Sequence, residues 1–591
     1  MDKSRYLIIG NNEATWKFDR PILFLGDWCL LHERKYIWNK LDSLVAEPYG
    51  MSKSSKDKDH IKSNEIFNNI FPILRNSLNQ YHQVNHDDRY WNILLGHWLT
   101  RYINAMINRI GTIEQCIEKY KISGVALFTD DQYLLATNDT HSSLWAFNDD
   151  QWNNVLYKSI FGYFNHNIPI DFIERNDSKR FIFKGLNYNI PFYKKFNLHI
   201  KDTISKFLKI FLKDNHIFVL HSYIGKLNEI KLQLSLKQMP QLWLSKDIKL
   251  NNKPDLKLRE DLKETIKFSP VDYKEKIIFE MLFDVIPICF LEGYQDLNEI
   301  VKKLDWPNNP KLIFTSNSFD TDEVFKFWTA SKINQGTKYI VGQHGGNYGT
   351  HRYANPTVEE KTSDIFLTWG WSDGLEQHTP AFVLNNLKYN DGQYNQNGGL
   401  LFVQDMVYHR IDTWDRISEH RNYYKNQLSF YDALSNNPQS DLILRLHSSH
   451  SHTNPFEAKM WLEHNPNINI DYGDNKLNKR ITQSRLSVFS YDSTGILELL
   501  SKNIPVMAFW DNNLDHIRDS AMPFYKELIE AEIIHLSPRS AAKKINEVWD
   551  DIESWWNNDV VQHARISFCE KYAVQSKNKI TDLKRIFEET L

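Results

Sequence analysis

The chain has 591 residues, of which 41% are hydrophobic and 25% are charged, and this balance excludes a disordered or fibrous protein. Its 71 basic and 74 acidic side chains are mixed along the sequence and give a net charge of −3, so no basic field is present to bind a nucleic-acid backbone. A single hydrophobic core does not grow to this length, and two α/β domains with additions are expected.

The first half begins with alternating strands and helices. Residues 6–10 and 21–25 are predicted strands, and the Lys- and Ser-rich segment 51–62 is a predicted exposed loop. A long helix is predicted from Asp88 to Tyr120, because apolar residues recur there every three or four positions. Further strands are expected at 125–129, 217–221 and 241–244.

The second half follows a polar segment at 246–270 and a predicted helical stretch at 274–304. Short apolar runs, predicted to be strands, then lie at 311–315, 339–342, 365–368, 399–403, 442–446, 468–472, 486–489 and 506–509. Most are separated by helical segments or turn residues, which is typical of a doubly wound parallel sheet. The predicted fold class is α/β, with two Rossmann-like domains that face a cleft.

Three segments follow from this pattern. An N-terminal domain with helical insertions is predicted over 1–270, an interdomain helical region over 271–308, and a C-terminal domain over 309–591. The four cysteines, Cys29, Cys116, Cys289 and Cys569, lie far apart, which indicates a reducing compartment. The first apolar stretch, about six residues, is too short for a signal peptide, and no run approaches the ~20 residues of a membrane span. A cytoplasmic protein is expected, with peripheral membrane contact left open.

A candidate phosphate site lies at the end of the predicted strand 486–489. Ser493, Thr494 and Gly495 open a helix whose free N–H groups can bind phosphate. Glu498 follows about one turn later, where it could accept hydrogen bonds from a ribose diol. The alternative is that Ser493 only caps the helix and Glu498 is a surface carboxylate.

A second candidate follows the predicted strand 339–342. Gln343, His344 and Gly345 begin a glycine-rich loop that ends at Arg352, and its side chains supply donors for anionic oxygen. It is not a G-x-G-x-x-G sequence, so no nicotinamide dinucleotide is implied. The alternative is a loop whose histidines are incidental.

Arg445 and His447 form a third candidate at the end of the strand 442–446. Alternation along the strand points both side chains to one side, where they could bind one phosphate; the alternative is a solvated strand end. The spacing of His447, His450 and His452 would permit zinc, but no carboxylate or thiolate lies nearby in the sequence. No metal site is therefore predicted.

These three motifs resemble the nucleotide-binding half of GT-B glycosyltransferases, and in particular bacterial capsule and lipopolysaccharide enzymes that use CMP-linked 3-deoxy-ulosonic sugars. The N-terminal sequences around Glu13, Asp27, His86 and Arg89 resemble a bacterial family of surface-polysaccharide transferases over nearly the whole chain. One departure is Ser448, because related CMP-sialic acid enzymes have His-Pro where this chain has His-Ser.

The resemblance implies a glycosyltransferase that moves a sugar from a nucleotide sugar, with CMP suspected, onto a carbohydrate or lipid-linked glycan acceptor of a bacterial surface polysaccharide. No other cofactor and no metal are expected, because a monophosphate leaving group needs no magnesium bridge. The leaving phosphate would contact His447, Arg445 or Arg352, and Asp27 is the first candidate for the base, with Glu13 and His86 as alternatives. Two other functions stay open: transfer of glycerol or ribitol phosphate from a CDP-linked donor, and a non-catalytic two-lobed scaffold of polysaccharide export.

Overall fold

The computed structural model describes the chain in twelve stretches: 3–129, 134–164, 167–174, 182–183, 203–205, 207–246, 250–354, 356–385, 387, 390–453, 456–511 and 513–591. The described strands form three large parallel sheets and a two-stranded pair, β5 (Leu134–Thr137) with β7 (Ile182–Phe183). We call the three the N-terminal, middle and C-terminal sheets.

The N-terminal sheet has five strands. In spatial order they are β3 (Ser43–Val45), β2 (Ile22–Phe24), β1 (Arg5–Ile8), β4 (Ile122–Phe128) and β6 (Ile170–Ile173). Tyr6, Leu7 and Ile8 are buried, as expected for a central strand covered on both faces. The chain order reverses between β1 and β4.

The middle sheet also has five strands, which follow one another in chain order. They are β8 (Phe218–Leu220), β9 (Leu312–Thr315), β10 (Lys338–Gly342), β11 (Ile365–Thr368) and β12 (His378–Pro380). The C-terminal sheet has six: β15 (Asn469–Asp471), β14 (Leu442–Arg445), β13 (Gly399–Val403), β16 (Ser484–Phe489), β17 (Val506–Phe509) and β18 (Ile534–His535). Its chain order reverses between β13 and β16.

Helices connect and cover the strands. In the first part of the chain they are α1 (Lys35–Trp38), α2 (Lys53–His82), α3 (Asp88–Lys119), α4 (Thr140–Ala146), α5 (Asp150–Tyr163), α7 (Lys226–Ser235), α8 (Leu256–Thr265), α9 (Tyr273–Val285), α10 (Tyr294–Lys302), α11 (Glu323–Ile333) and α12 (Val358–Thr362). In the last part they are α13 (His420–Ala433), α14 (Asn436–Ser440), α15 (His450–Thr453), α16 (Glu457–His464), α17 (Leu477–Gln483), α18 (Thr494–Ser501), α19 (Met522–Glu530), α20 (Pro538–Val548), α21 (Ile552–Trp556), α22 (Asp559–Tyr572) and α23 (Lys579–Thr590).

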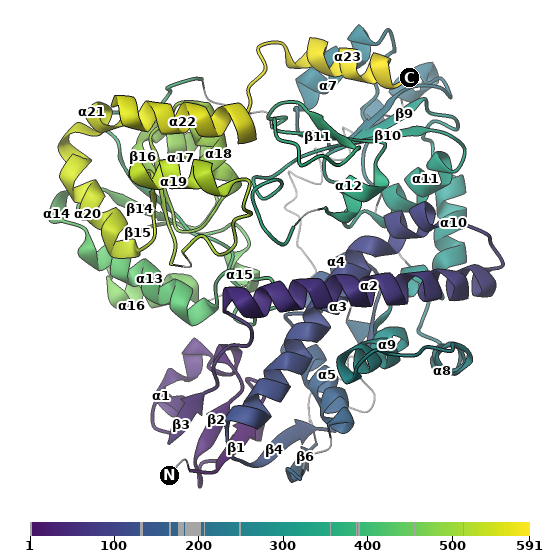
Figure 1. The fold of residues 1–591 in the computed structure, drawn as a ribbon, viewed down its shortest axis with the longest axis vertical. Helices are drawn as coiled ribbons and strands as arrows, with labels where there is room; N and C mark the ends of the chain where they lie inside the picture. The colour runs from purple at the N-terminus through teal and green to yellow at the C-terminus, as the bar shows by residue number, and fades with distance from the viewer. Residues whose placement is uncertain are drawn as a thin grey trace.

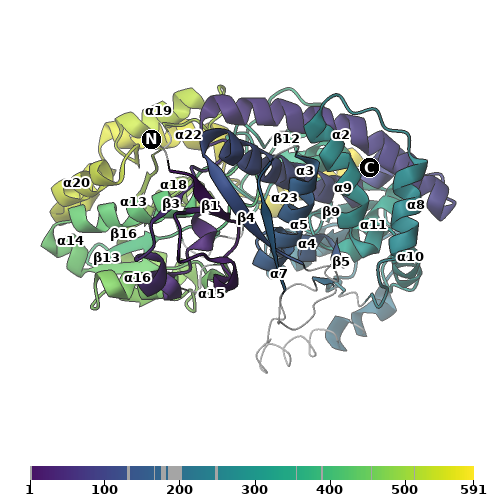
Figure 2. The same cartoon turned by 90° about the horizontal axis from the view of Figure 1, so that it is seen from below.

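Two helices tie the three sheets together. The long α2 runs across the molecule between the N-terminal sheet and the rest (Figure 1). The last helix, α23, leaves the C-terminal sheet and packs on the middle sheet, where the ring of Phe587 lies 5.1 Å from that of Phe314. Seen from below, the N-terminal sheet lies in front of the junction between the other two (Figure 2). Among the described helices, none combines the length and the apolar character that a membrane crossing requires.

The predicted α/β class is confirmed, because all strand pairings in the three sheets are parallel. The middle and C-terminal sheets carry the predicted cleft, described below, and the N-terminal sheet is an addition to the predicted pair. Strands from the range 309–591 belong to two sheets, and β8, from the range 1–270, joins the first of them. Sheet membership therefore changes between β12 and β13, not at 271–308.

Three local predictions are wrong. The segment 51–62, predicted as an exposed loop, belongs largely to α2, which buries Lys56 and Asp59. Residues 241–244 form no strand. The backbone N–H of Gln241 donates to Gln233 Oε1, and its carbonyl accepts from Gln233 Nε2, so these groups are not available to a neighbouring strand. The helical stretch 274–304 is broken into α9 and α10, and Pro287 lies at the break, since proline cannot continue a helix.

Candidate functional site

A cavity of about 620 Å³ lies at the carboxyl ends of the C-terminal sheet. The segments after β13 and β16 both line it, and the strand order of this sheet reverses between these two strands. In open parallel sheets, ligands bind outside the carboxyl ends of the strands at such a reversal. The topology therefore marks this cavity as the candidate site.

Three parts of the molecule give most of the cavity wall, and Leu144 and Phe147 at α4 complete it. The C-terminal sheet gives residues 405–408, 410–413 and 415–418 after β13, residues 490–494 after β16, and Trp510 and His516 after β17. The middle sheet contributes Asn347 and His351 from the loop after β10, while α3 contributes Arg101 and Asn104. The predicted cleft between two Rossmann-like sheets is therefore present, and α3 closes part of it.

The N-terminus of α18 faces this cavity. Ser493 is the N-cap, and its Oγ accepts a hydrogen bond from the Gly495 N–H at 3.1 Å. Ser493 and Thr494 both line the cavity, as the sequence predicts for a phosphate site. The Gly346 N–H donates to Thr494 Oγ1 at 2.9 Å, and a side chain at Gly346 would lie 3.3 Å from the Thr494 backbone. The glycine-rich loop thus packs directly against the start of α18.

Asp492 lies next to this helix start and gathers two histidines. Asp492 Oδ2 lies 3.2 Å from His351 Nε2 and 3.2 Å from His516 Nε2, and it accepts a hydrogen bond from the Tyr525 hydroxyl at 2.8 Å. Burial alone would raise the pKa of Asp492, but the two histidines lower it far below its ordinary value. A buried carboxylate is therefore present in the cavity wall.

The cavity-lining segment 405–418 is held from outside its own sheet. Lys56 of α2 donates to the Trp414 carbonyl at 3.0 Å, and Arg109 of α3 donates to the Ile411 carbonyl at 2.6 Å. Arg410 forms a buried ion pair with Asp150 of α5 at 2.7 Å. The N-terminal part of the chain thus fixes one wall of the candidate site.

Asp405 in this wall and the nearby Glu457 of α16 both have raised pKa values. Burial raises the pKa of Asp405, which lines the cavity directly after β13. Burial and the charge of Asp405 raise the pKa of Glu457 to about 8. Carboxyl groups with raised proton affinity are candidates for general acid–base chemistry.

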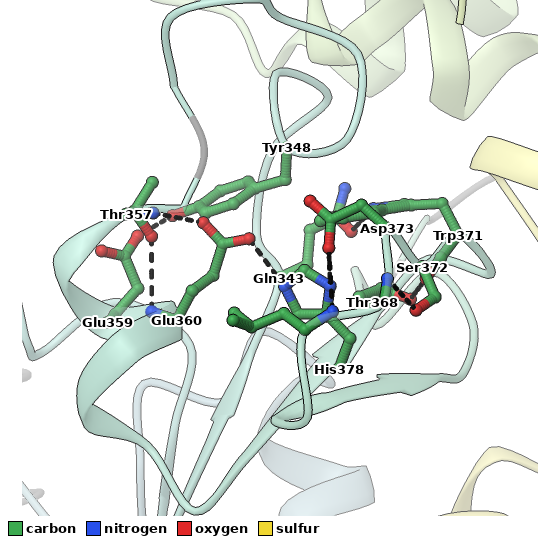
Figure 3. A network of polar contacts seen from close by, with 12 residues as sticks. Gln343, Tyr348, Thr357, Glu359, Glu360, Thr368, Trp371, Ser372, Asp373 and His378 are labelled. Atoms are coloured by element: carbon green, nitrogen blue, oxygen red, sulfur yellow. Dashed lines mark hydrogen bonds and ion pairs between the residues drawn. The ribbon is translucent and has the colours of Figure 1, made fainter. Parts of the chain in front are cut away.

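Gln343, predicted to bind the donor, lies in the interior of the middle sheet. Its Oε1 accepts from the Trp369 N–H and from Trp371 Nε1, both at 2.8 Å, and its Nε2 donates to the Gly345 carbonyl at 2.8 Å. Figure 3 shows Gln343 and Trp371 within the surrounding polar network. Gln343 holds the loop that contains Gly345 in place. Its amide oxygen and nitrogen are hydrogen-bonded to other groups of the protein.

A buried network surrounds Gln343 (Figure 3). Thr357 and Glu360 form a capping box at the start of α12. Glu360 Oε1 also lies 2.9 Å from His378 Nε2, and Tyr348 donates to Glu359. These bonds join α12, β12 and the loop after β10, so that loop has a defined shape next to α18.

His344 and Arg352, also predicted in the loop after β10, lie outside the described lining of the cavity, whereas Gly345 packs against Thr494. His344 packs near the rings of Tyr223 and Phe319, both 5.8 Å away between ring centroids, and burial lowers its pKa. Arg352 is ion-paired with Asp57 of α2 at 2.8 Å and with Asp519 at 3.1 Å. Its guanidinium connects elements of the fold.

Arg445 and His447 are not brought to one phosphate position by the structure. Arg445 forms an ion pair with Asp471 at 2.8 Å. His447 Nδ1 accepts from the Ser449 N–H at 3.2 Å, and burial lowers the pKa of His447, against the charge of Asp405. His447 lies outside the described lining of the cavity.

Glu498 and Asp27 line other cavities. Glu498 borders a cavity of about 790 Å³ and accepts a hydrogen bond from Asn385. Asp27 borders a cavity of about 380 Å³, where it pairs with His420 at 3.0 Å and Arg421 at 3.2 Å. Burial alone would raise the pKa of Asp27, but the hydrogen bond from His420 and the nearby charges lower it below its ordinary value.

The two acceptor-side candidates, Glu13 and His86, also lie outside the described lining of the 620 Å³ cavity. Glu13 is paired with Arg34. His86 stacks on Tyr90 at 3.6 Å and faces Asn334 at the end of α11. The structure therefore brings Ser493 and Thr494 to the cavity and distributes the remaining predicted residues around it.

Comparison with protein-family models gives one match, to the LIC12162 family transferase model, over residues 5–587. This match spans nearly the whole chain. The chain belongs to the LIC12162 transferase family. The predicted bacterial transferase family is thereby confirmed at this level, and the chain is an enzyme of the transferase class.

Solved structures similar to this LIC12162 family transferase share little sequence with it. The wall teichoic acid polymerase TagF is 11% identical, with 68% of this chain and 98% of that chain covered and a TM-score of 0.32. A UDP complex of MnaA from S. aureus is 14% identical, with 64% and 97% covered and a TM-score of 0.36. The pneumococcal O-GlcNAc transferase GtfA is 12% identical, with 51% and 60% covered and a TM-score of 0.30. Comparison with curated proteins gave no match.

Sequence reasoning missed several groups of the LIC12162 transferase site. Asp405 and Arg410 belong to a segment without a glycine motif, and only their place after the predicted strand 399–403 could have signalled them. Asp492 precedes the recognised Ser493 directly, so a carboxylate beside a helix start was a usable signal. No sequence pattern indicated that His351 and His516 lie close together, because 164 residues separate them.

Proposed function

We propose that this transferase is a glycosyltransferase that moves a sugar from a nucleotide-sugar donor onto a bacterial surface polysaccharide. The observation that carries the proposal is the 620 Å³ cavity at the strand-order reversal between β13 and β16, with the N-terminus of α18 in its wall. Backbone N–H groups at a helix start, together with the helix dipole, stabilise phosphate.

The donor phosphate is proposed to bind at Ser493 and Thr494. Arg410 and Arg416 line the same cavity; they are ion-paired with Asp150 and Asp412, respectively, and a bound phosphate would share their guanidinium groups. The nucleoside is proposed to be cytidine and the sugar a 3-deoxy-ulosonic acid; the sequence resemblance alone supports this choice. The acceptor is proposed to be a carbohydrate or a lipid-linked glycan reached from the cytoplasm.

The base is proposed to be Asp405 in preference to Asp27. Asp405 lines the cavity and burial raises its pKa, whereas Asp27 lies in another cavity and has a lowered pKa. A base must reach the proton it removes, and a higher pKa gives a stronger driving force for its transfer. Asp27 is retained as an alternative that a replacement by Asn can test.

Calorimetric titration with CMP, CDP, UDP and GDP, with and without magnesium, tests the nucleotide. Ser493→Ala should weaken nucleotide binding at least about fivefold, which corresponds to ~1 kcal/mol. The matched control is Ser537→Ala: Ser537 caps α20 by accepting from the Ser540 N–H and lies outside the described lining of the cavity. Each variant removes one N-cap, which should cost ~1 kcal/mol of stability. The two variants therefore differ only in whether the lost serine lines the cavity.

The outcomes separate the candidate functions. Nucleotide binding that Ser493→Ala weakens and Ser537→Ala does not supports the site. Equal effects of the two variants would remove the support for α18. A glycosidic product supports the glycosyltransferase, a phosphodiester product would replace it by a CDP-alditol phosphotransferase, and binding without transfer to any acceptor would favour a scaffold.

A further inference from the structure

The cluster His351, Asp492 and His516 arranges three metal-ligating groups around one point in the cavity wall. Each offers one ligand atom, and these atoms all lie within 4.8 Å of one another. We propose that this cluster binds one divalent transition-metal ion, such as Zn²⁺ or Mn²⁺, through the two Nε2 atoms and the Asp492 carboxylate. Two histidines with one carboxylate form a known ligand set for these ions.

The distances from the two histidines to Asp492 are those of neighbouring ligands on one metal ion. Both histidines of the cluster lie 3.2 Å from Asp492 Oδ2. With bonds of about 2.0–2.1 Å in tetrahedral geometry, neighbouring ligand atoms are about 3.3 Å apart.

Backbone contacts hold the two histidine segments together. The Arg352 N–H donates to the His516 carbonyl at 2.7 Å, and the Arg518 N–H donates to the Thr350 carbonyl at 2.9 Å. His351 also forms an isolated antiparallel bridge with Ile517. The ligands are thereby positioned in advance, so less conformational entropy is lost when an ion binds.

The immediate surroundings suit a cation. The Tyr525 hydroxyl donates to Asp492 Oδ2 at 2.8 Å, and such outer hydrogen bonds orient ligating carboxylates. His351, Asp492 and His516 all line the 620 Å³ cavity, which leaves room for a further ligand from solvent or substrate.

A second cluster, Asp27, His409 and His420, also brings three such ligand atoms together. There the guanidinium of Arg421 lies 3.2 Å from Asp27 Oδ1 and would repel a cation. Among the described side chains, Asp492 has no lysine or arginine ion pair within 4.0 Å. Charge therefore favours the His351 cluster, and the Asp27 cluster becomes its matched control.

The proposal that the cluster binds an ion does not depend on the proposed function. The role of that ion at the donor phosphate does rest on the proposed function. Asp492 directly precedes Ser493, so an ion in the cluster would lie beside the proposed phosphate position. It would neutralise phosphate charge there. This departs from the expectation of a metal-independent enzyme.

The test uses the metal-depleted full-length chain. Calorimetry with Zn²⁺ and Mn²⁺, and the visible spectrum with Co²⁺, should show one ion bound per chain. His351→Ala and Asp492→Asn should each weaken binding at least tenfold, while His409→Ala in the control cluster should not change it. Since Asp492 is buried and its variant could misfold, the more exposed His351 variant decides the matter. Absence of binding, or binding lost with His409→Ala and kept with His351→Ala, overturns the proposal.

Nucleotide titration of the same samples separates this inference from the proposed function. Tighter nucleotide binding in the presence of the ion supports its role at the phosphate. Equal nucleotide binding with and without the ion would overturn that role. Ion binding by a chain that binds no nucleotide would overturn the proposed function and leave the metal site standing.

Discussion

Carboxyl groups around the 620 Å³ cavity differ in charge because their neighbours differ. Asp492 has a lowered pKa beside two histidines, whereas burial raises the pKa of Asp405 and Glu457. Burial disfavours the ionised form of all three, and only Asp492 has donors that outweigh it. The cavity wall thus carries an ionised carboxylate at Asp492 and a carboxyl group with raised proton affinity at Asp405.

Glu457 makes folding stability depend on pH. Its pKa is raised from 4.5 to about 8, so the folded state binds the proton more tightly than the unfolded state. The resulting stability is complete below about pH 4.5 and is lost as the pH rises through 8. We therefore compare the free energy of unfolding of Glu457→Gln with that of wild type at each pH. The difference, variant minus wild type, should be more positive at pH 9 than at pH 6 by at least about 1 kcal/mol. Chemical denaturation at the two pH values measures the difference.

The matched control is Glu588→Gln on α23, whose side chain is 57% exposed. Its free energy of unfolding relative to wild type should be the same at pH 6 and pH 9 within about 0.5 kcal/mol. If Glu457→Gln shows no more pH dependence than this control, Glu457 is not protonated in the folded protein near neutral pH.

Most elements near the site could be predicted from local sequence, and the exceptions share a cause. The strand runs and the start of α18 at Thr494 follow from short-range patterns. The beginning of α2 was predicted as a loop because its buried residues, Lys56 and Asp59, are charged. The Lys56 ammonium group donates hydrogen bonds to two carbonyls that lie 358 and 360 residues away in the chain. Local periodicity contains no information about such partners.

The start of α2 is expected to support the cavity wall. Lys56→Met removes two hydrogen bonds to the Trp414 and Arg416 carbonyls while keeping the length of the side chain. Leaving these buried carbonyls unpaired should cost about 1–3 kcal/mol of stability. The freed segment should also bind nucleotide more weakly, as calorimetry would show. Lys58→Met, at an exposed position of the same helix, is the control and should change neither quantity.

At the scale of the whole molecule, the middle and C-terminal sheets share one site, and α3 closes part of it. Parallel sheets and a cleft follow from the alternation of strands and helices, but the assignment of strands to sheets does not. β8 and β9 are neighbours in the middle sheet although about 90 residues lie between them, and long connections of this kind leave no local pattern. The cavity wall needs the N-terminal part as well, through Arg109 of α3 and Asp150 of α5.

The buried ion pair between Arg410 and Asp150 should dominate the attachment of the N-terminal sheet to the cavity wall. Arg410 has a side chain only 3% exposed and stacks over Trp28 at 4.4 Å. Arg410→Met leaves Asp150 without this partner in a mostly buried place, and breaking a buried pair costs about 3–5 kcal/mol. Arg421→Met is the control, because Arg421 makes the comparable contact to Asp27 but is 53% exposed, so about 0–1 kcal/mol is expected. The midpoint of chemical denaturation measures both variants. Equal losses would show that the attachment depends on the apolar contacts between these parts and not on the buried charge pair.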